Sequence, residues 1–184
     1  MPSTRSRGDK IESVPATQIN YHRYRNSSPD PRSMASKRAG KRAAAFVADS
    51  SVVDLAGSRA LVAGTPEEAA SSELVCGCTS STDPVVPTAA IQPGTHVGLV
   101  GSYSTARREV AADLLAKATV FVDDRGAAAD EAGELILAAR SGDWSFGAVA
   151  GDLTELCLGT TGRTSDDEIT LFKSVGLAVW DLIV

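Results

Sequence analysis

Short apolar runs alternate with segments of helical pattern along this chain, and this alternation limits the possible folds more than any other feature. The residues expected to form strands are 59–63, 74–78, 96–101 and 119–123, and the expected helices are 37–47, 107–118, 126–140 and 148–158. Strands that alternate with helices predict a parallel sheet covered by helices on both faces. The pattern therefore predicts an α/β fold whose loops gather along one edge.

A further helix has a clear beginning at Thr65. Pro66 follows it, and Glu68 stands three residues after the threonine. This spacing is a capping box, in which each side chain satisfies a backbone N–H at the helix start, and proline is favoured at the first helical position. A helix is expected to begin here.

The same spacing recurs near the end of the sequence, where Glu168 follows Ser165. Apolar residues at helical intervals come next, so a long closing helix is expected over Ser165–Asp181. Lys173 and Ser174 interrupt the apolar stripe. Most polar interruptions of this kind face solvent, and this is the interpretation that the pattern favours.

Polar and glycine-containing loops directly follow two of the expected strands. Residues 79–84 read TSSTDP, and residues 101–103 read GSY. Ligands bind beyond the carboxyl ends of the strands in open parallel sheets, so these loops are candidates for a binding site. Residues 79–84 fit an ordinary polar turn equally well. His96, at the start of a strand, is expected to be a solvated or core imidazole and not a catalytic one.

Charge divides the chain unevenly. Up to Arg42 there are ten basic and three acidic residues, and the rest of the chain has eight basic and twenty acidic residues. Residues 1–36 show neither helical nor strand periodicity and are expected to be a disordered leader, because no aromatic platform accompanies their charge. We therefore expect no nucleic-acid partner. The apolar runs are too short to cross a membrane, and the first residues lack a secretory signal, which predicts a cytoplasmic protein without a membrane partner.

No metal site is expected. Cys76 and Cys78 form a C-x-C pair, and the only histidines are His22 and His96. Structural zinc sites normally use four nitrogen or sulfur ligands, which this set does not supply at suitable spacing.

Four blocks of sequence resemble, in the same order, the ornithine cyclodeaminase and mu-crystallin family. The blocks are residues 79–85 (TSSTDPV), 94–109 (GTHVGLVGSYSTARRE), 120–134 (VFVDDRGAAADEAGE) and 167–176 (DEITLFKSVG). The resemblance implies an incomplete Rossmann-like, doubly wound parallel sheet with a long C-terminal helix, over residues 37–184. It also implies NAD or NADP as cofactor, an amino acid or cyclic imine as substrate, and a homodimer in intact family members.

The resemblance also assigns roles to individual residues. It places Thr79, Val100, Gly101, Arg107 and Ser174 at the cofactor, and Tyr103 and Val175 at the substrate. It identifies no catalytic residue in this chain.

Tyr103 departs from the family pattern. Ornithine cyclodeaminases and related alanine dehydrogenases have an aspartate at this position, where it assists proton transfer. A carboxylate can act as a base at neutral pH, whereas a phenol with an ordinary pKa near ~10 cannot. Tyr103 therefore favours an imine reductase over an ornithine cyclodeaminase.

Two parts of the family pattern are not recognisable. The sequence contains no G-x-G-x-x-G motif, which would hold a dinucleotide pyrophosphate, and nothing in residues 1–36 resembles the lysine-bearing substrate domain. The chain thus resembles the back half of a longer protein. Two hypotheses remain: an NAD(P)-dependent oxidoreductase, or a non-catalytic fragment or small-molecule-binding domain. Arg25, in a polar turn, would favour NADP if that turn meets the ribose, but the choice between NAD and NADP stays open.

Overall fold

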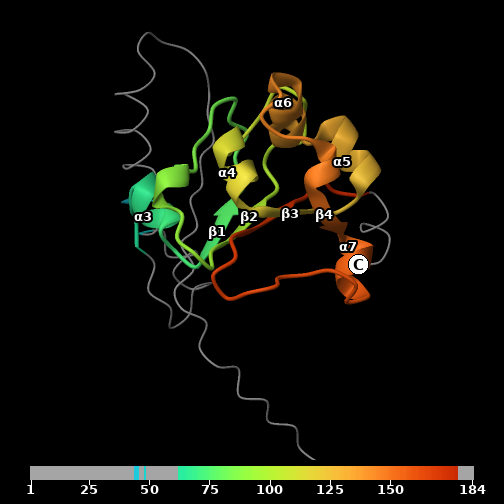
Figure 1. Ribbon diagram of the computed structural model, residues 1–184. Helices are drawn as coiled ribbons and strands as arrows, with labels where there is room; N and C mark the ends of the chain where they lie inside the picture. The colour runs from blue at the N-terminus through green and yellow to red at the C-terminus, as the bar shows by residue number, and fades with distance from the viewer. Residues whose placement is uncertain (1–43, 46–47, 49–61, 178–184) are drawn as a thin grey trace, which may run out of the picture.

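The computed structural model describes residues 62–177 together with residues 44, 45 and 48 (Figure 1). The described residues form a five-stranded sheet in the order β1-β2-β5-β3-β4, and all its neighbouring strands run parallel. The strands are β1 (Leu74–Gly77), β2 (His96–Leu99), β3 (Thr119–Val122), β4 (Val149–Asp152) and β5 (Thr170–Lys173). The predicted α/β fold with a parallel sheet is confirmed. The predictions for residues 1–36, for most of 37–47 and for 59–61 lie outside the described residues.

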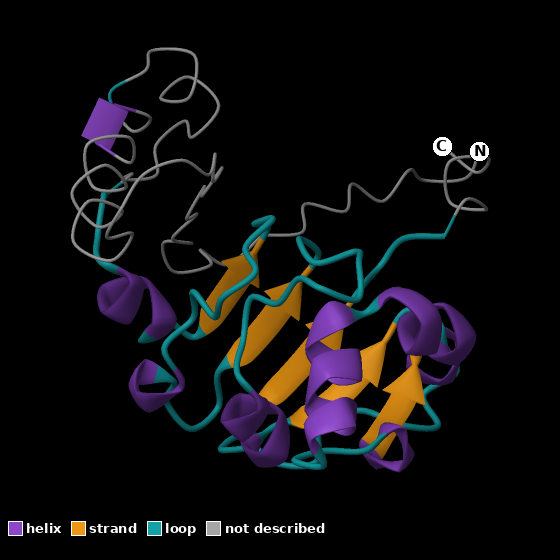
Figure 2. Ribbon diagram, turned by 90° about the horizontal axis from the view of Figure 1, so that it is seen from above, coloured by secondary structure: helices purple, strands orange, loops and turns teal. Residues whose placement is uncertain are grey.

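The helices cover the sheet from two sides. They are α3 (Pro66–Ala70), α4 (Ala112–Lys117), α5 (Arg125–Glu131), α6 (Gly133–Ser141) and α7 (Leu153–Cys157), with 3₁₀ turns at Thr88–Ala90 and Phe146–Ala148. Figure 1 shows α4, α5 and α6 above the sheet and α7 below it, and Figure 2 shows the strands pointing the same way. Right-handed crossovers explain this placement, because the chain advances across the sheet from β1 to β4 and then returns to β5. None of the described helices is long and apolar enough to cross a membrane.

The core lies between the sheet and α4 to α6. Leu99 and Leu171 of the sheet are fully buried there, as are Leu114 of α4 and Leu135 of α6. Burial of a leucine-sized side chain contributes about 1.5–3 kcal/mol relative to exposure. This packing fixes the strands and holds their carboxyl ends at one edge of the sheet.

The predicted capping box of α3 is confirmed. The Glu68 N–H donates to Thr65 Oγ1 at 3.2 Å, and the Thr65 N–H donates to Glu68 Oε2 at 2.7 Å. Pro66 occupies the first helical position. All three signals are local in sequence, which is why the sequence alone predicts this helix.

The closing helix predicted over Ser165–Asp181 is wrong for the part that the structure describes. Residues 170–173 form β5, the central strand of the sheet, and residues 178–181 lie outside the described ones. A strand buried on both faces carries a continuous apolar run, which periodicity alone does not distinguish from a buried helix.

The apparent capping box at Ser165 is a turn. The Glu168 N–H donates to the backbone oxygen of Ser165 at 3.2 Å. The Glu168 carboxylate accepts the N–H and hydroxyl of Thr164 and the hydroxyl of Thr119, the first residue of β3. Glu168 therefore ties the turn before β5 to the neighbouring strand.

Three other predicted helices differ from the observed ones. The helix expected over 107–118 begins only at Ala112, so Arg107 lies in the preceding loop. The helix expected over 126–140 is broken at Ala132 into α5 and α6. The first part of the helix expected over 148–158 is strand β4, which is too short to show a period-2 pattern.

We expect acid to remove a stabilising contribution from Glu168. The hydrogen bond from Thr119, followed by that from the Thr164 N–H, lowers the pKa of Glu168 from 4.5 to about 2. A lowered carboxyl pKa stabilises the fold fully above pH 4.5, and this stabilisation disappears as the pH falls towards 2. Glu168→Gln should therefore lower Tm at pH 6, and the difference from the wild type should shrink below pH 4.5.

Thermal unfolding followed by circular dichroism at several pH values tests this expectation. Glu131→Gln, at an exposed position of α5, is the matched control and should leave Tm nearly unchanged. A constant difference between Glu168→Gln and the wild type from pH 6 to pH 2 would contradict the assignment.

Candidate functional site

Four strands end side by side at the carboxyl edge of the sheet. Thr79 follows β1, Gly101 follows β2, Asp123 follows β3 and Ser174 follows β5. Backbone hydrogen bonds continue past the strand ends: the Ser174 N–H donates to Leu99 O at 2.9 Å, and the Asp123 N–H donates to Lys173 O at 3.2 Å. Thr79, Gly101 and Ser174, which the sequence assigns to one site, therefore lie at one edge, although their roles there stay predictions.

The loops after β1 and β2 are packed tightly against each other at Gly101. A Cβ atom at this position would overlap the backbone oxygen and nitrogen of Thr79 and would lie 2.7 Å from Glu109 Oε1. Only glycine lets the two loops approach this closely. Thr79 itself is buried.

Val100 directly precedes Gly101, and Tyr103 and Arg107 follow it in the same loop. The side chain of Val100 is 52% exposed and that of Tyr103 is 56% exposed. The Arg107 guanidinium lies 4.9 Å from the centre of the Tyr103 ring, a cation–π contact. Arg107 Nη1 is buried and has no hydrogen-bond partner among the described residues. The edge thus offers an apolar surface and, beside it, a half-buried positive charge.

Asp123 connects the end of β3 to the end of β5. Its Oδ2 accepts the Ser174 hydroxyl at 2.8 Å, the Val175 N–H at 2.7 Å and the Gly176 N–H at 2.9 Å. Gly176 has a φ of +86°, which glycine adopts without strain. Ser174 and Val175, both predicted site residues, are therefore held in place by one carboxylate.

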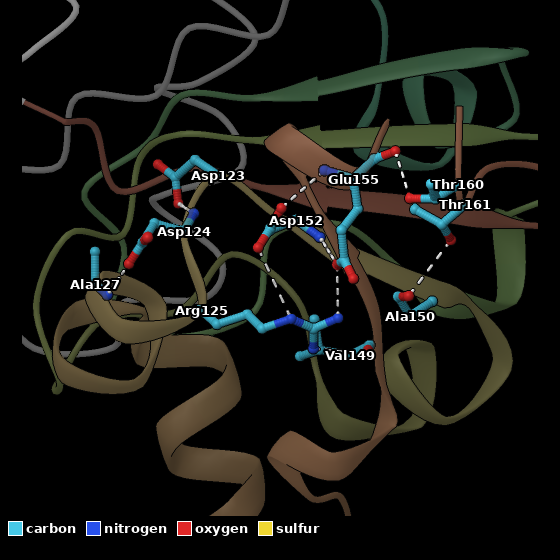
Figure 3. A network of polar contacts seen from close by, with 10 residues as sticks. All are labelled: Asp123, Asp124, Arg125, Ala127, Val149, Ala150, Asp152, Glu155, Thr160 and Thr161. Atoms are coloured by element: carbon cyan, nitrogen blue, oxygen red, sulfur yellow. Dashed lines mark hydrogen bonds and ion pairs between the residues drawn. The ribbon is translucent and has the colours of Figure 1, made fainter. Parts of the chain in front are cut away.

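A second polar network joins the ends of β3 and β4 (Figure 3). The Asp124 N–H donates to Asp123 Oδ1 at 2.9 Å. Arg125 donates to Val149 O at 3.0 Å and to Glu155 Oε2 at 2.8 Å, and lies 3.9 Å from Asp152. These exposed pairs add little stability individually, but they connect α5 to the start of α7.

Three charged side chains are buried beneath the site. Lys173 and Glu109 have 0% relative exposure, and Glu134 has 2%. Lys173 Nζ lies 3.8 Å from Glu134 Oε2, and no described group forms a hydrogen bond with it. Burial lowers the pKa of Lys173 below its ordinary value, while Glu134, Glu109 and Asp123 act against that change. Burial also raises the pKa of Glu134, opposed mainly by Lys173.

Sequence reasoning missed most of these charged residues. Lys173 was expected to face solvent as an interruption of a helical stripe, but it belongs to a central strand and is fully buried. Ser174 is also buried, so the solvated interpretation is wrong for both. Asp123 directly follows a strand. Ligands bind beyond the carboxyl ends of parallel strands, and this rule, already applied to residues 79–84, would have found Asp123. Glu109 and Glu134 carry no comparable local signal.

His96 lies at the opposite edge of the sheet, at the start of β2. Its Nδ1 is 2.8 Å from Thr170 Oγ1, and burial, followed by the charge of Arg163, lowers its pKa. His96 is thus a half-buried imidazole with a hydrogen-bond partner, and it lies away from the loops that follow the strands.

The carboxyl edge fits one half of a dinucleotide. Exposed Val100 offers an apolar contact for a nicotinamide ring, and the half-buried Arg107 guanidinium, beside Tyr103, offers a positive charge for an anionic group. A pyrophosphate normally binds to a glycine-rich turn at a helix N-terminus, and the sequence contains no G-x-G-x-x-G. The described residues therefore fit the nicotinamide end, and they supply no such turn for the phosphates.

Comparison with known proteins gives one family. The family model described as "Ornithine cyclodeaminase/mu-crystallin family" matches residues 36–184. The chain is 38% identical over 126 residues to a Delta(1)-pyrroline-2-carboxylate reductase from Paracoccus denitrificans (strain Pd 1222). That match covers 68% of this chain and 40% of the relative, so the chain spans less than half the relative's length.

Two solved structures with bound nicotinamide cofactors also match this chain. The Delta(1)-pyrroline-2-carboxylate reductase of Thermococcus litoralis, solved with NADH and L-proline, matches with a TM-score of 0.68 and 28% identity, over 83% of this chain and 45% of that chain. An archaeal alanine dehydrogenase dimer with bound NAD matches with a TM-score of 0.68 and 28% identity, over 80% of this chain and 44% of that chain. The Rossmann-like architecture predicted for this chain is thereby confirmed.

Proposed function

The chain belongs to the ornithine cyclodeaminase/mu-crystallin family, and from this premise we propose that it supplies the nicotinamide side of an NAD(P)-dependent imine reductase. One observation carries the proposal: Thr79, Gly101 and Ser174 lie at one edge of the sheet, at the ends of strands far apart in sequence. Ligands bind at this edge of open parallel sheets.

The proposed roles of individual residues follow from the resemblance to the family. Thr79, Val100, Gly101, Arg107 and Ser174 meet the cofactor, and Tyr103 and Val175 face the substrate. Val100 covers one face of the nicotinamide ring with an exposed apolar side chain. Nicotinamide supplies the hydride, and the protein supplies orientation and electrostatics.

The substrate class is a cyclic imine or an amino acid. Tyr103 stands where cyclodeaminases have an aspartate, so this chain lacks a carboxylate base at that position. Relatives named Delta(1)-pyrroline-2-carboxylate reductases support the same preference for imine reduction. A cyclic imino acid such as pyrroline-2-carboxylate is therefore the first substrate to test.

Titration with NADH and with NADPH, followed by nicotinamide fluorescence, tests the binding step. A saturable enhancement is expected with at least one of them, and the tighter binder identifies the cofactor. Loss of absorbance at 340 nm upon addition of pyrroline-2-carboxylate then tests the reduction. No saturable signal with either cofactor would contradict the proposal.

The second candidate is a non-catalytic fragment or small-molecule-binding domain. Its motive is the lack of a recognisable G-x-G-x-x-G motif in the sequence, whereas the relatives named as reductases favour the enzyme. Saturable cofactor binding without any oxidation by the imine would support this candidate over the enzyme. A homodimer and a cytoplasmic location stay predictions, the first checked by light scattering during the same titration.

Arg107→Gln should weaken cofactor binding by about tenfold, because a hydrogen bond from a charged donor typically contributes about 1.5–3 kcal/mol. Fluorescence titration measures the change in Kd. Arg140→Gln removes the same charge from an exposed position of α6 and should leave the Kd unchanged. Equal Kd values for Arg107→Gln and the wild type would remove Arg107 from the proposed site.

A further inference from the structure

We propose that the buried group Glu109, Glu134 and Lys173 positions the loops after β1 and β2, so that Thr79 and Gly101 meet the nicotinamide. The inference rests on the proposed function and extends it to residues that face neither cofactor nor substrate. They are positioning residues, because each acts through the loops that it holds.

Glu109 joins the two loops directly. Its Oε1 accepts the Thr79 N–H, and its Oε2 accepts the Gly101 N–H at 2.9 Å. The Glu109 carboxylate therefore bridges the second residues of two loops that are separated in sequence. Its own backbone oxygen accepts the Val85 N–H at 2.8 Å, which ties the far end of the first loop to the same residue.

Glu134 supports Glu109 from the N-terminal turn of α6. Glu134 Oε1 accepts the Glu109 N–H at 3.1 Å, and Oε2 accepts the hydroxyl of Ser102, the residue after Gly101. Glu109 therefore holds the backbone of the loop after β2 at Gly101, and Glu134 holds the side chain of the next residue, Ser102.

Lys173 supplies the positive charge for this group. Its fully buried ammonium lies at the end of the central strand, close to Glu134 and within electrostatic reach of Glu109 and Asp123. Removal of one partner leaves the buried carboxylates without compensation, whereas removal of both charges is often tolerated. The ammonium therefore determines whether Glu134 can keep its carboxylate contacts with Ser102 and Glu109.

The hydrogen bonds of this group indicate that it positions the two loops and does not only stabilise the fold. Buried ion pairs add little net stability compared with apolar residues of similar size. Here each carboxylate oxygen of Glu109 and Glu134 accepts a hydrogen bond from one of the two loops, which contain Thr79, Gly101 and Ser102. A small displacement of such supporting groups is enough to disturb a binding geometry.

Hydrogen–deuterium exchange and NADH titration of four variants test the proposal. Lys173→Met should accelerate exchange in residues 79–83 and 101–104 more than in β3, and should raise the Kd for NADH by about tenfold or more. Adding Glu134→Gln to Lys173→Met should restore slow exchange in these loops and bring the Kd back to within about threefold of the wild type.

Leu115→Ala is the matched control, since Leu115 is a buried residue of α4 that does not contact the two loops through a hydrogen bond. It should lower Tm without a change in the Kd for NADH. Exchange that rises evenly through the sheet in Lys173→Met, as in Leu115→Ala, or a double variant without any recovery, would overturn the proposal.

Glu109→Gln decides the question if Lys173→Met does not fold. An amide has one accepting oxygen, so either the Thr79 or the Gly101 N–H loses its acceptor, and exchange at that loop should accelerate. Unchanged exchange in both loops would overturn the proposal. If the wild type binds neither NADH nor NADPH, the proposed function fails, but the exchange measurements still decide whether the group positions the loops.

Discussion

Gly101→Ala is expected to destabilise the fold by about 3 kcal/mol, because an added Cβ overlaps the backbone of Thr79 and cannot be relieved by rotation of a side chain. To accept the alanine, the loops after β1 and β2 must separate. Urea unfolding followed by circular dichroism measures the change in the free energy of unfolding. Cofactor binding should weaken as well, since Thr79 and Gly101 would no longer keep their spacing.

Gly98→Ala is the matched control for this prediction. Gly98 lies in β2, the strand that precedes Gly101, and a Cβ there would have no neighbour within 4 Å among the described residues. Alanine is favoured over glycine in a strand by about 0.5–1 kcal/mol, so this variant should be as stable as the wild type or slightly more stable. Equal unfolding free energies for Gly101→Ala and Gly98→Ala would show that the two loops are not packed as described.

Asp123→Ala is expected to have an effect of similar size. It leaves the Ser174 hydroxyl and the backbone N–H of Val175 without their acceptor, and it leaves the Gly176 N–H with only the Ser174 hydroxyl oxygen, at 3.2 Å. Loss of hydrogen bonds to a charged, buried acceptor costs about 3 kcal/mol, because the donors are left unsatisfied. The free energy of unfolding in urea should fall accordingly, and the amide resonance of Gly176 should shift.

Asp124→Ala separates this effect from a simple change of charge. Asp124 is exposed and caps α5, where its side chain accepts the Ala127 N–H at 2.8 Å. Loss of a helix cap costs about 1 kcal/mol. If Asp123→Ala proved no more destabilising than Asp124→Ala, Asp123 would not be the residue that holds Ser174 and Val175.

The sequence predicted the elements whose signals are local. The α3 helix begins where three residues within four positions indicate it, and β1, β2 and β3 lie within the predicted runs because polar turns bound them. The predicted convergence of the loops rests on a general property of parallel sheets, in which every carboxyl end lies at the same edge. This property grouped Thr79 with Gly101, whereas Ser174 was placed with them only by the resemblance to the family and was assigned to the wrong kind of element.

The remaining features depend on contacts between distant parts of the chain. Residues 170–173 form a strand because β2 and β3 pair with them on both sides, which no local pattern records. Lys173 is buried because Glu134, on another element, lies next to it. The local pattern therefore predicts a helix over these residues and a solvated Lys173, and tertiary contacts override this prediction.

The central position of β5 also affects the order in which the sheet can be assembled during synthesis. Until residues 170–173 leave the ribosome, the pairs β1–β2 and β3–β4 share no ladder, and β2 and β3 each present an open edge. Open strand edges invite pairing with other chains. The nascent chain, more than the finished fold, is therefore expected to be the species that needs protection by chaperones.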